Sequence, residues 1–495
     1  MSGVPGVPGV IALVDEGLGN SAYLVDLGDG RALAVDASRD LRRLRGAAAG
    51  SGLRVTFAAE THLHADFLSG AVQLAADEGA RVLASAAGER QFPHTGLKDG
   101  DEVDLGGLRL QVLATPGHTG EHLAFLLLDG DRPLGVFTGG SLIVGSAART
   151  DLVSPDRTVE LARAQYASVR RLLTLSDDLP VWPTHGAGSF CSAPPGADRT
   201  TTIGRERTTN PLLVGIGGPP AGEDEFVSRL LAGLGTYPTY FGRLGELNRR
   251  GPALVPVPVT PSALSVDDVL ALQGRGAQVV DVRPVEAFAA GHVPGSLSNP
   301  LRPAFGTWLG WLADPERPVV VVCDRPTPHD VDDRDNVDEM DEVVWQALKV
   351  GFDNVVGELA GGLRAWRDAG LPVTATSVVS ASEAAGDTGR TTVLDVRQDS
   401  EFAAGHVPGA VHLELGRLLD PEAVAAIRPG PVLVMCGHGE RAMSAASLLL
   451  AAGRTDVAVL AGGPDDLCAA TGTDLARGPA VSGSPAVSEG AGERS

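Results

Sequence analysis

Residues 278–295 read QVVDVRPVEAFAAGHVPG, and residues 392–409 read TVLDVRQDSEFAAGHVPG. The two stretches share Asp-Val-Arg and Ala-Gly-His-Val-Pro-Gly at the same internal spacing. Leu-Ala-Gly-Gly then follows in both, at 359–362 and 460–463. A long-period repeat of this kind indicates a duplicated structural unit. We therefore expect two domains of similar fold in the C-terminal half of the chain.

Each repeat alternates strand patterns with helix patterns. AQVVDVR and TTVLDVR are apolar and β-branched, as buried strands are, and PVVVVC (318–323) and PVLVMC (431–436) are further strands that end in a cysteine. This alternation predicts a parallel α/β sheet in each repeat. Chemistry in such sheets sits at the carboxyl ends of strands, which is where Cys323 and Cys436 fall.

The second repeat continues from its strand into Cys436-Gly-His-Gly-Glu-Arg441, followed by the helical run AMSAASLLLAAG. A short loop that opens a helix points backbone N–H groups inward and stabilises a thiolate or a persulfide anion. Glycines allow the cramped backbone, and Arg441 can add a fixed positive charge. We predict Cys436 and Arg441 as catalytic residues, in a substrate-binding loop made of Gly437, His438, Gly439 and Glu440.

Residues 262–476 resemble two tandem rhodanese domains through these paired motifs. The resemblance implies that Cys436 accepts a sulfane sulfur and passes it to a nucleophile such as cyanide or a thiol. The first copy departs from the pattern, because its loop reads Cys323-Asp-Arg-Pro-Thr-Pro-His-Asp and Pro326 and Pro328 lack N–H donors. We therefore interpret the first copy as inactive, with a structural or docking role.

Histidines recur in loop-like motifs upstream. Thr61-His62-Leu-His64-Ala-Asp66-Phe67 comes first, Thr115-Pro-Gly-His118-Thr-Gly-Glu-His122 follows, and Pro183-Thr-His185 is last. Histidines at i and i+2 on a loop after a strand can converge on a metal. The candidate ligands are His62, His64, Asp66, His118 and His185.

This order of motifs resembles the metallo-β-lactamase fold over about residues 8–200. A domain of that fold followed by rhodanese repeats is similar to the persulfide dioxygenase–rhodanese fusions. The resemblance implies an αββα sandwich and a mononuclear Fe(II) held by two histidines and one carboxylate. It also implies a small-molecule persulfide or thiol, dioxygen and sulfite as reaction partners, and it is compatible with a homodimer.

Two residues depart from the pattern of these families. Phe67 stands where a second metal site has a histidine, which is normal in the mononuclear branch. Gly140 stands where the relatives have an aspartate ligand. His64 could complete a three-His site in its place, and Asp66 is a nearby carboxylate. A three-His site would suit zinc about as well as iron.

The predicted fold is α/β and α+β: an N-terminal metallo-β-lactamase-like αββα sandwich followed by two rhodanese-like parallel α/β domains. The expected boundaries are 8–200 for the sandwich, 201–260 for a connector packed on it, 262–375 and 378–476 for the rhodanese-like domains, and 477–495 for a disordered tail.

Net charge and cysteine content indicate which partners and which cellular compartment to expect. The formal net charge is −22 and the sequence pI is about 4.9, which argues against nucleic acid or an anionic membrane as partner. The N-terminus has no basic region before an apolar run, and no stretch of 18 apolar residues occurs. Four widely spaced cysteines match no disulfide framework, so we expect a cytoplasmic protein.

Three other functions remain open from the sequence. The N-terminal domain could be catalytically silent beside an active sulfurtransferase, because Gly140 removes a ligand. The chain could be a thioester hydrolase of the glyoxalase II type, although Phe67 and Gly140 remove ligands that such hydrolysis needs. It could also be a persulfide sensor or relay without turnover.

Overall fold

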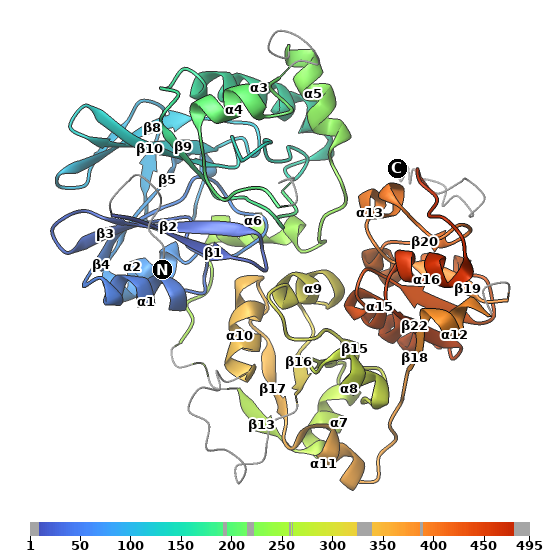
Figure 1. Cartoon of the computed structure of the whole chain (residues 1–495). Coiled ribbons are helices and arrows are strands. Elements are labelled where there is room, and N and C mark those ends of the chain that lie inside the picture. The colour runs from blue at the N-terminus through green and yellow to red at the C-terminus, as the bar shows by residue number, and fades with distance from the viewer. Residues whose placement is uncertain are drawn as a thin grey trace, which may run out of the picture. The chain divides into compact units, whose positions relative to one another are not determined.

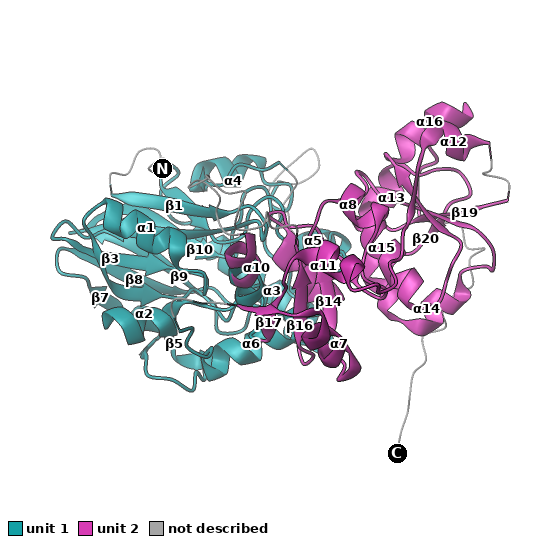
Figure 2. Cartoon of the chain, turned by 90° about the horizontal axis from the view of Figure 1, so that it is seen from below, with its two compact units in different colours: residues 1–259, 345–353 teal, residues 260–344, 354–495 magenta. Residues whose placement is uncertain are grey.

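The computed structural model describes residues 9–191, 196–214, 222–256, 259, 261–323, 339–386 and 390–479. The chain divides into two compact units (Figure 2), which we call unit 1 and unit 2. Unit 1 comprises residues 1–259 and 345–353, and unit 2 comprises 260–344 and 354–495. No helix in the described ranges is both long and apolar enough to cross a membrane.

Unit 1 contains two six-stranded sheets, each with its strands in sequence order across the sheet (Figure 1). The strands of the first sheet are β1 (Val10–Asp15), β2 (Asn20–Asp26), β3 (Arg31–Val35), β4 (Arg54–Ala59), β5 (Arg81–Ser85) and β6 (Thr95–Leu97). Those of the second are β7 (Glu102–Asp104), β8 (Leu108–Ala114), β9 (Leu123–Asp129), β10 (Arg132–Gly139), β11 (Pro180–Pro183) and β12 (Thr201–Thr202).

Three hydrophobic clusters make unit 1 a four-layer structure. The inner faces of the two sheets meet in a core that includes Tyr23, Phe125, Phe137 and Trp182. The other face of the first sheet packs against α1 (Arg42–Gly50) and α2 (Ala71–Glu78). The other face of the second packs against α3 (Thr158–Leu172), α4 (Ile203–Thr209) and α5 (Glu223–Ala232). The arrangement confirms the predicted αββα sandwich.

Unit 2 contains two five-stranded sheets with the same strand order. The first runs β13-β17-β16-β14-β15 and the second β18-β22-β21-β19-β20, and every strand pairing is parallel. The first copy consists of β13 (Ser262–Leu264), α7 (Val266–Gly274), β14 (Gln278–Asp281), α8 (Val285–Ala290), β15 (Leu297–Ser298), α9 (Phe305–Leu312), β16 (Val319–Val322), α10 (Glu339–Lys349), β17 (Val355–Leu359) and α11 (Gly362–Asp368). The part of α10 from Trp345 onward is assigned to unit 1.

The second copy repeats this plan. It consists of β18 (Ser377–Ser380), α12 (Ala381–Ala385), β19 (Thr392–Asp395), α13 (Asp399–Ala404), β20 (Val411–His412), α14 (Pro421–Ala426), β21 (Val432–Met435), α15 (Glu440–Ala451), β22 (Val457–Ala461) and α16 (Pro464–Thr471). The two parallel α/β domains that the repeat predicts are therefore confirmed.

The repeated motifs make the same contacts in both copies. Arg283 donates two hydrogen bonds to Asp281 and one to the Gly291 carbonyl, and Arg397 does the same with Asp395 and Gly405. His292 and His406 each stack on a phenylalanine four residues earlier and bond its carbonyl. These motifs tie the end of a strand to the next turn, which gives them a structural role in each domain.

Candidate metal centre and sulfur site

The predicted histidines lie in loops at the ends of strands in unit 1. His62 and His64 follow β4, His118 lies between β8 and β9, and His185 follows β11. Loops from both sheets therefore supply the centre. Each of these imidazoles is at most 1% exposed.

His62, His118 and His185 form one group. Their ligand atoms all lie within 4.8 Å of one another, and Nε2 of His62 is 3.4 Å from Nε2 of His185. Nitrogen ligands about 2 Å from a tetrahedral metal lie about 3.3 Å from each other. The spacing of this pair is therefore that of two ligands sharing one metal ion.

Hydrogen bonds fix the rings of His62 and His118. Nδ1 of His118 lies 2.6 Å from the Arg149 carbonyl, so it carries the proton and leaves Nε2 free to coordinate. Nδ1 of His62 lies 2.8 Å from the Thr61 hydroxyl, which itself donates to Asp36. Burial lowers the pKa of His118 to about 3 and that of His62 well below its usual value. Both rings are neutral at physiological pH, as metal ligands must be.

His64 faces a different partner. Its Nε2 lies 3.3 Å from Asp36, and its ring stacks on Phe67 with centroids 4.2 Å apart. It belongs with Asp36 and His62 in a second group of potential ligands. The imidazole whose ligand atom groups with those of both His62 and His118 is therefore that of His185, which the sequence had offered as a candidate ligand beside His64.

Asp66 sits behind His185. Its Oδ2 accepts from the Asn20 amide at 2.7 Å and lies 3.4 Å from Nδ1 of His185. Burial alone would raise the pKa of Asp66, but His185 beside it holds that pKa below its usual value. Asp66 and His185 form a further group with Cys191, whose thiol the sequence gave no reason to place here. Asp66 is thus placed to orient His185.

Neighbouring residues leave no space for a side chain at position 140. A Cβ atom added there would lie 2.5 Å from Cδ2 of the His118 ring. The Gly140 N–H donates to Nε2 of His122 at 3.0 Å, and Nδ1 of His122 lies 2.9 Å from the Thr115 hydroxyl. Both nitrogens of His122 are therefore engaged, so this buried histidine supports the loop and does not reach a metal. A carboxylate at 140 would need His118 to move.

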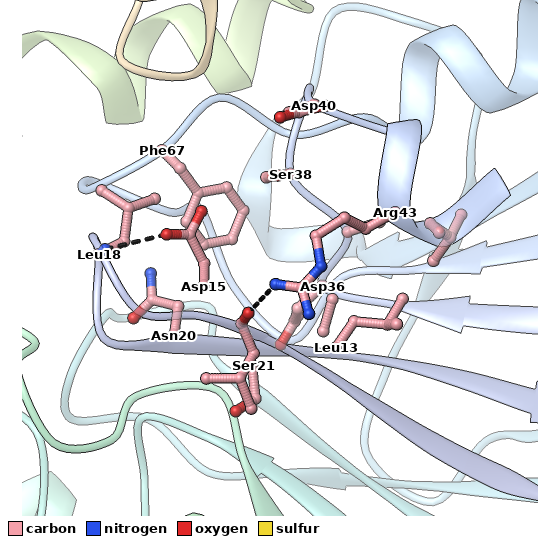
Figure 3. Close-up of a pocket in the computed structure, with 14 residues that line it drawn as sticks. Leu13, Asp15, Leu18, Asn20, Ser21, Asp36, Ser38, Asp40, Arg43 and Phe67 are labelled. Carbon is pink, nitrogen blue, oxygen red and sulfur yellow. Dashed lines mark hydrogen bonds between the residues drawn. The ribbon is translucent and has the colours of Figure 1, made fainter. Parts of the chain in front are cut away.

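Several residues that orient the imidazoles also line a pocket next to the centre. Asn20, Asp36 and Phe67 are among its lining residues, together with Asp15 and Arg43 (Figure 3). No histidine lines it among the described residues. A molecule in this pocket would touch the supports of the centre and not the imidazoles.

The donor set fits a divalent metal ion. Burial lowers the pKa of His185, but Cys191 and Asp66 beside it outweigh this and raise the pKa well above its usual value. The His185 ring must therefore release a proton when it binds a metal. Three imidazole ligands would leave at least one coordination position open. Two further buried atoms nearby, Nδ1 of His64 and Oδ1 of Asp66, have no hydrogen-bond partner in the described part of the chain. Buried polar atoms without partners are costly unless an ion or a water satisfies them.

In unit 2, Cys436 lies directly after β21 and is 1% exposed. The Gly439 N–H donates to its sulfur at 3.1 Å. Gly439 has φ of 102°, which favours glycine, and α15 begins at the next residue. The strand–loop–helix arrangement predicted around Cys436 is present, with the start of a helix facing the sulfur.

The positive charge of Arg441 is paired with a carboxylate. Its guanidinium donates two hydrogen bonds to Glu401, at 2.6 and 2.8 Å. Burial lowers the pKa of Arg441, but the hydrogen bonds to Glu401 outweigh this and raise it. Arg441 is therefore a neutralised cation that fixes the loop, and Glu401 is a partner that the sequence did not identify.

Cys323 in the first copy has a different environment. Its thiol donates to Glu358 at 3.0 Å, so a carboxylate faces it where a backbone N–H faces Cys436. The residues that led us to interpret this loop as inactive, Asp324 to Asp330, lie outside the described residues, and so does the predicted tail from residue 480 onward.

Comparison with known families agrees with this architecture. The family model for the metallo-beta-lactamase superfamily matches residues 15–185, and the model for the rhodanese-like domain matches 265–369 and 378–470. A crystal structure of a metallo-beta-lactamase from Staphylococcus aureus subsp. aureus COL superposes with a TM-score of 0.60 at 27% identity. The superposition covers 71% of this chain and 98% of the chain in that crystal structure.

Two curated relatives match parts of the chain. Persulfide dioxygenase ETHE1 of Homo sapiens is 31% identical over 165 residues, which are 33% of this chain and 58% of the relative. A hydroxyacylglutathione hydrolase of Acidiphilium cryptum is 38% identical over 112 residues, 22% of this chain and 45% of the relative. The chain thus spans about half the length of these relatives. Together with the rhodanese-like domains, the first relative supports a role in sulfur metabolism.

Proposed function

Because residues 15–185 belong to the metallo-β-lactamase superfamily and residues 265–369 and 378–470 are rhodanese-like domains, we propose that the protein is an enzyme of sulfide and persulfide metabolism. It oxidises a low-molecular-weight thiol persulfide at a mononuclear metal and transfers sulfane sulfur through a persulfide on Cys436. The observation that carries the proposal is the convergence of His62, His118 and His185 in a chain that also presents Cys436 to a helix N-terminus.

In unit 1, the three imidazoles would hold the metal. Iron(II) in that position would supply redox chemistry with dioxygen and open coordination positions for the persulfide. Thr61 and the Arg149 carbonyl keep two of the rings in the tautomer that leaves Nε2 free, and Asp66 orients the third. Burial of the site excludes bulk water from the reacting sulfur.

The oxidation balances as one persulfide, one dioxygen and one water giving a thiol, hydrogen sulfite and a proton. The outer sulfur of the persulfide is oxidised and dioxygen is reduced. Sulfite is then a nucleophile for the second site.

At Cys436, the thiolate attacks the outer sulfur of a donor, and a sulfur–sulfur bond forms as the donor's own bond breaks. The donor leaves with the electron pair. The terminal sulfur of the persulfide is anionic, and the Gly439 N–H and the start of α15 stabilise that charge. Attack by sulfite on this outer sulfur releases thiosulfate and restores the Cys436 thiolate.

A thioester hydrolase is the second candidate, because one relative is named hydroxyacylglutathione hydrolase. Such hydrolysis uses two metals. Phe67 is buried against His64 where a second-site ligand would stand. This observation favours a single metal and therefore the oxidation.

The proposal is tested by anaerobic reconstitution of the full chain with Fe(II), followed by oxygen uptake on addition of glutathione persulfide. We expect uptake that His118→Ala abolishes. No uptake, with transfer through Cys436 intact, would overturn the oxidation and leave a sulfurtransferase with a silent N-terminal domain. Hydrolysis of a glutathione thioester by the same preparation would favour the second candidate.

A further inference from the structure

A pocket in unit 2 has walls from both rhodanese-like copies. The second copy contributes His438, Gly439 and Glu440, which belong to the loop that carries Cys436. The first copy contributes Pro300, Leu301 and Arg302. The two copies also touch through a hydrogen bond from the Ser298 N–H to the Ser447 hydroxyl, at 3.1 Å.

Arg302 lies in the turn between β15 and α9, at the carboxyl end of the first sheet. The turn is anchored, because the Leu301 N–H donates to the Val282 carbonyl at 2.8 Å and the Phe305 N–H donates to the carbonyl of Arg302. Its guanidinium lies close enough to Cys436, Glu440 and Arg441 for their charges to influence it. Arg302 is thus held at the wall of a pocket that is also lined by the loop that carries Cys436.

Arg302 differs from Arg441 in its partners. Arg441 is neutralised by Glu401, whereas no ion pair joins Arg302 to a carboxylate in the described ranges, and its buried Nε has no hydrogen-bond partner there. Glu286 and Glu339 also line the pocket but are exposed, so water and salt screen their charges. Glu440 is partly buried, at the start of α15. The cation that remains available in the pocket is therefore supplied by the first copy.

We propose that Arg302 binds the sulfur oxyanion that donates or accepts sulfur at Cys436, so that the first copy completes the substrate pocket of the second. The inference rests on the proposed transfer through Cys436. Planar guanidinium groups bind tetrahedral oxyanions through paired, charge-assisted hydrogen bonds.

In the reaction with thiosulfate, the proposed role of Arg302 is to bind the sulfonate oxygens. The Cys436 thiolate attacks the outer sulfur, the sulfur–sulfur bond of thiosulfate breaks, and sulfite leaves with the electron pair. The two negative charges of thiosulfate are carried away on sulfite. Arg302 faces the three oxygens in both states, so it lowers the KM for thiosulfate more than it raises kcat.

The test compares the steady-state transfer from thiosulfate to cyanide by the full chain and by Arg302→Gln. We expect the KM for thiosulfate to rise about tenfold or more with kcat changed much less. Arg302→Lys keeps the charge and should recover part of the affinity. Arg364→Gln is the matched control, because Arg364 is an exposed arginine of the first copy, 83% accessible, and should leave KM unchanged. An unchanged KM in Arg302→Gln overturns the inference.

A binding measurement separates this inference from the proposed function. Thiosulfate is titrated calorimetrically into the Cys436→Ser chain with and without Arg302→Gln. Weaker binding in the double variant supports the role of Arg302 even if the chain shows no turnover. Equal binding in both overturns that role even if transfer through Cys436 is intact.

Discussion

Tautomer control of His62 and His118 comes from two ordinary groups, a threonine hydroxyl and a backbone carbonyl. Because these partners hold Nδ1, the coordinating nitrogens face each other across a few ångströms without any change of rotamer. His64 lacks this arrangement, since its Nε2 is directed at Asp36. The geometry therefore favours His185 over His64 as the third ligand.

We expect His185→Ala to lose most of the bound metal and His64→Ala to retain most of it. Both changes remove a fully buried imidazole from the same region, so each is a control for the other. Metal per chain, measured by elemental analysis after reconstitution with Fe(II) or Zn(II), is the readout. The opposite ranking would assign the third position to His64.

The sequence identified the candidate ligands because their motifs are local, but it could not choose between His64 and His185. That choice depends on which loops the two sheets bring together. Asp36 and Asn20 went unassigned for the same reason, since each reaches the centre from a part of the chain distant from the residue that it contacts. Glu401, the partner of Arg441, is separated from it in the sequence by β20, α14 and β21.

Among the elements, α6 (Phe241–Arg250) has a role that the sequence did not suggest. Asn248 donates to the carbonyls of His64 and Phe67 at 2.7 and 2.9 Å, and its Oδ1 accepts from the Ser69 N–H at 2.9 Å. One buried amide therefore shapes the loop that carries three candidate ligands, His62, His64 and Asp66. The segment predicted only as a connector supports the centre.

We expect Asn248→Ala to reduce metal retention and to lower the free energy of unfolding of unit 1 by about 2–4 kcal/mol, because three buried backbone groups lose their partner. Glu246→Gln is the control, since it changes a partly exposed residue on the same helix whose side chain pairs, among the described residues, only with arginines of that helix. Thermal unfolding and metal content measure the two effects. Equal behaviour of the two variants would show that the loop holds its shape without α6.

The loop before α15 depends on the backbone of Gly439. We expect Gly439→Ala to reduce transfer through Cys436 by about tenfold to a hundredfold, because the strained residue no longer directs its N–H at the sulfur. Gly453→Ala is the matched control. It also has a positive φ, of 87°, and an added Cβ has free space at both positions.

Transfer rates together with unfolding curves distinguish a local effect from a general one. If both variants lose the same activity, backbone strain alone explains the loss, and the N–H of residue 439 has no specific role in stabilising the sulfur.

The strands and the helix around Cys436 could be predicted from the sequence because their patterns are strongly apolar and repeated. The ends of the short helices could not, since they depend on contacts with neighbouring elements.

For the whole molecule, the proposed reactions lie in different units and share sulfite as a chemical link. We expect Cys436→Ser to leave persulfide-dependent oxygen uptake within about twofold of the unmodified chain. We expect His118→Ala to leave thiosulfate-to-cyanide transfer equally intact. Oxygen electrode and thiocyanate assays on the two full-length variants make the comparison. Loss of both activities in either variant would show that the two sites depend on each other.

The depth at which His62, His118 and His185 lie affects how an ion could arrive. At 1% exposure or less, none of these rings can be reached from solvent without a local opening of unit 1. Exchange of a bound ion should therefore be limited by the rate of that opening, so the folded chain would keep an ion from the cellular pool until it is incubated with a chelator or an excess of another metal. Purified protein would carry a record of that pool, and its metal content would reflect the growth medium as much as the intrinsic affinities of the ligands.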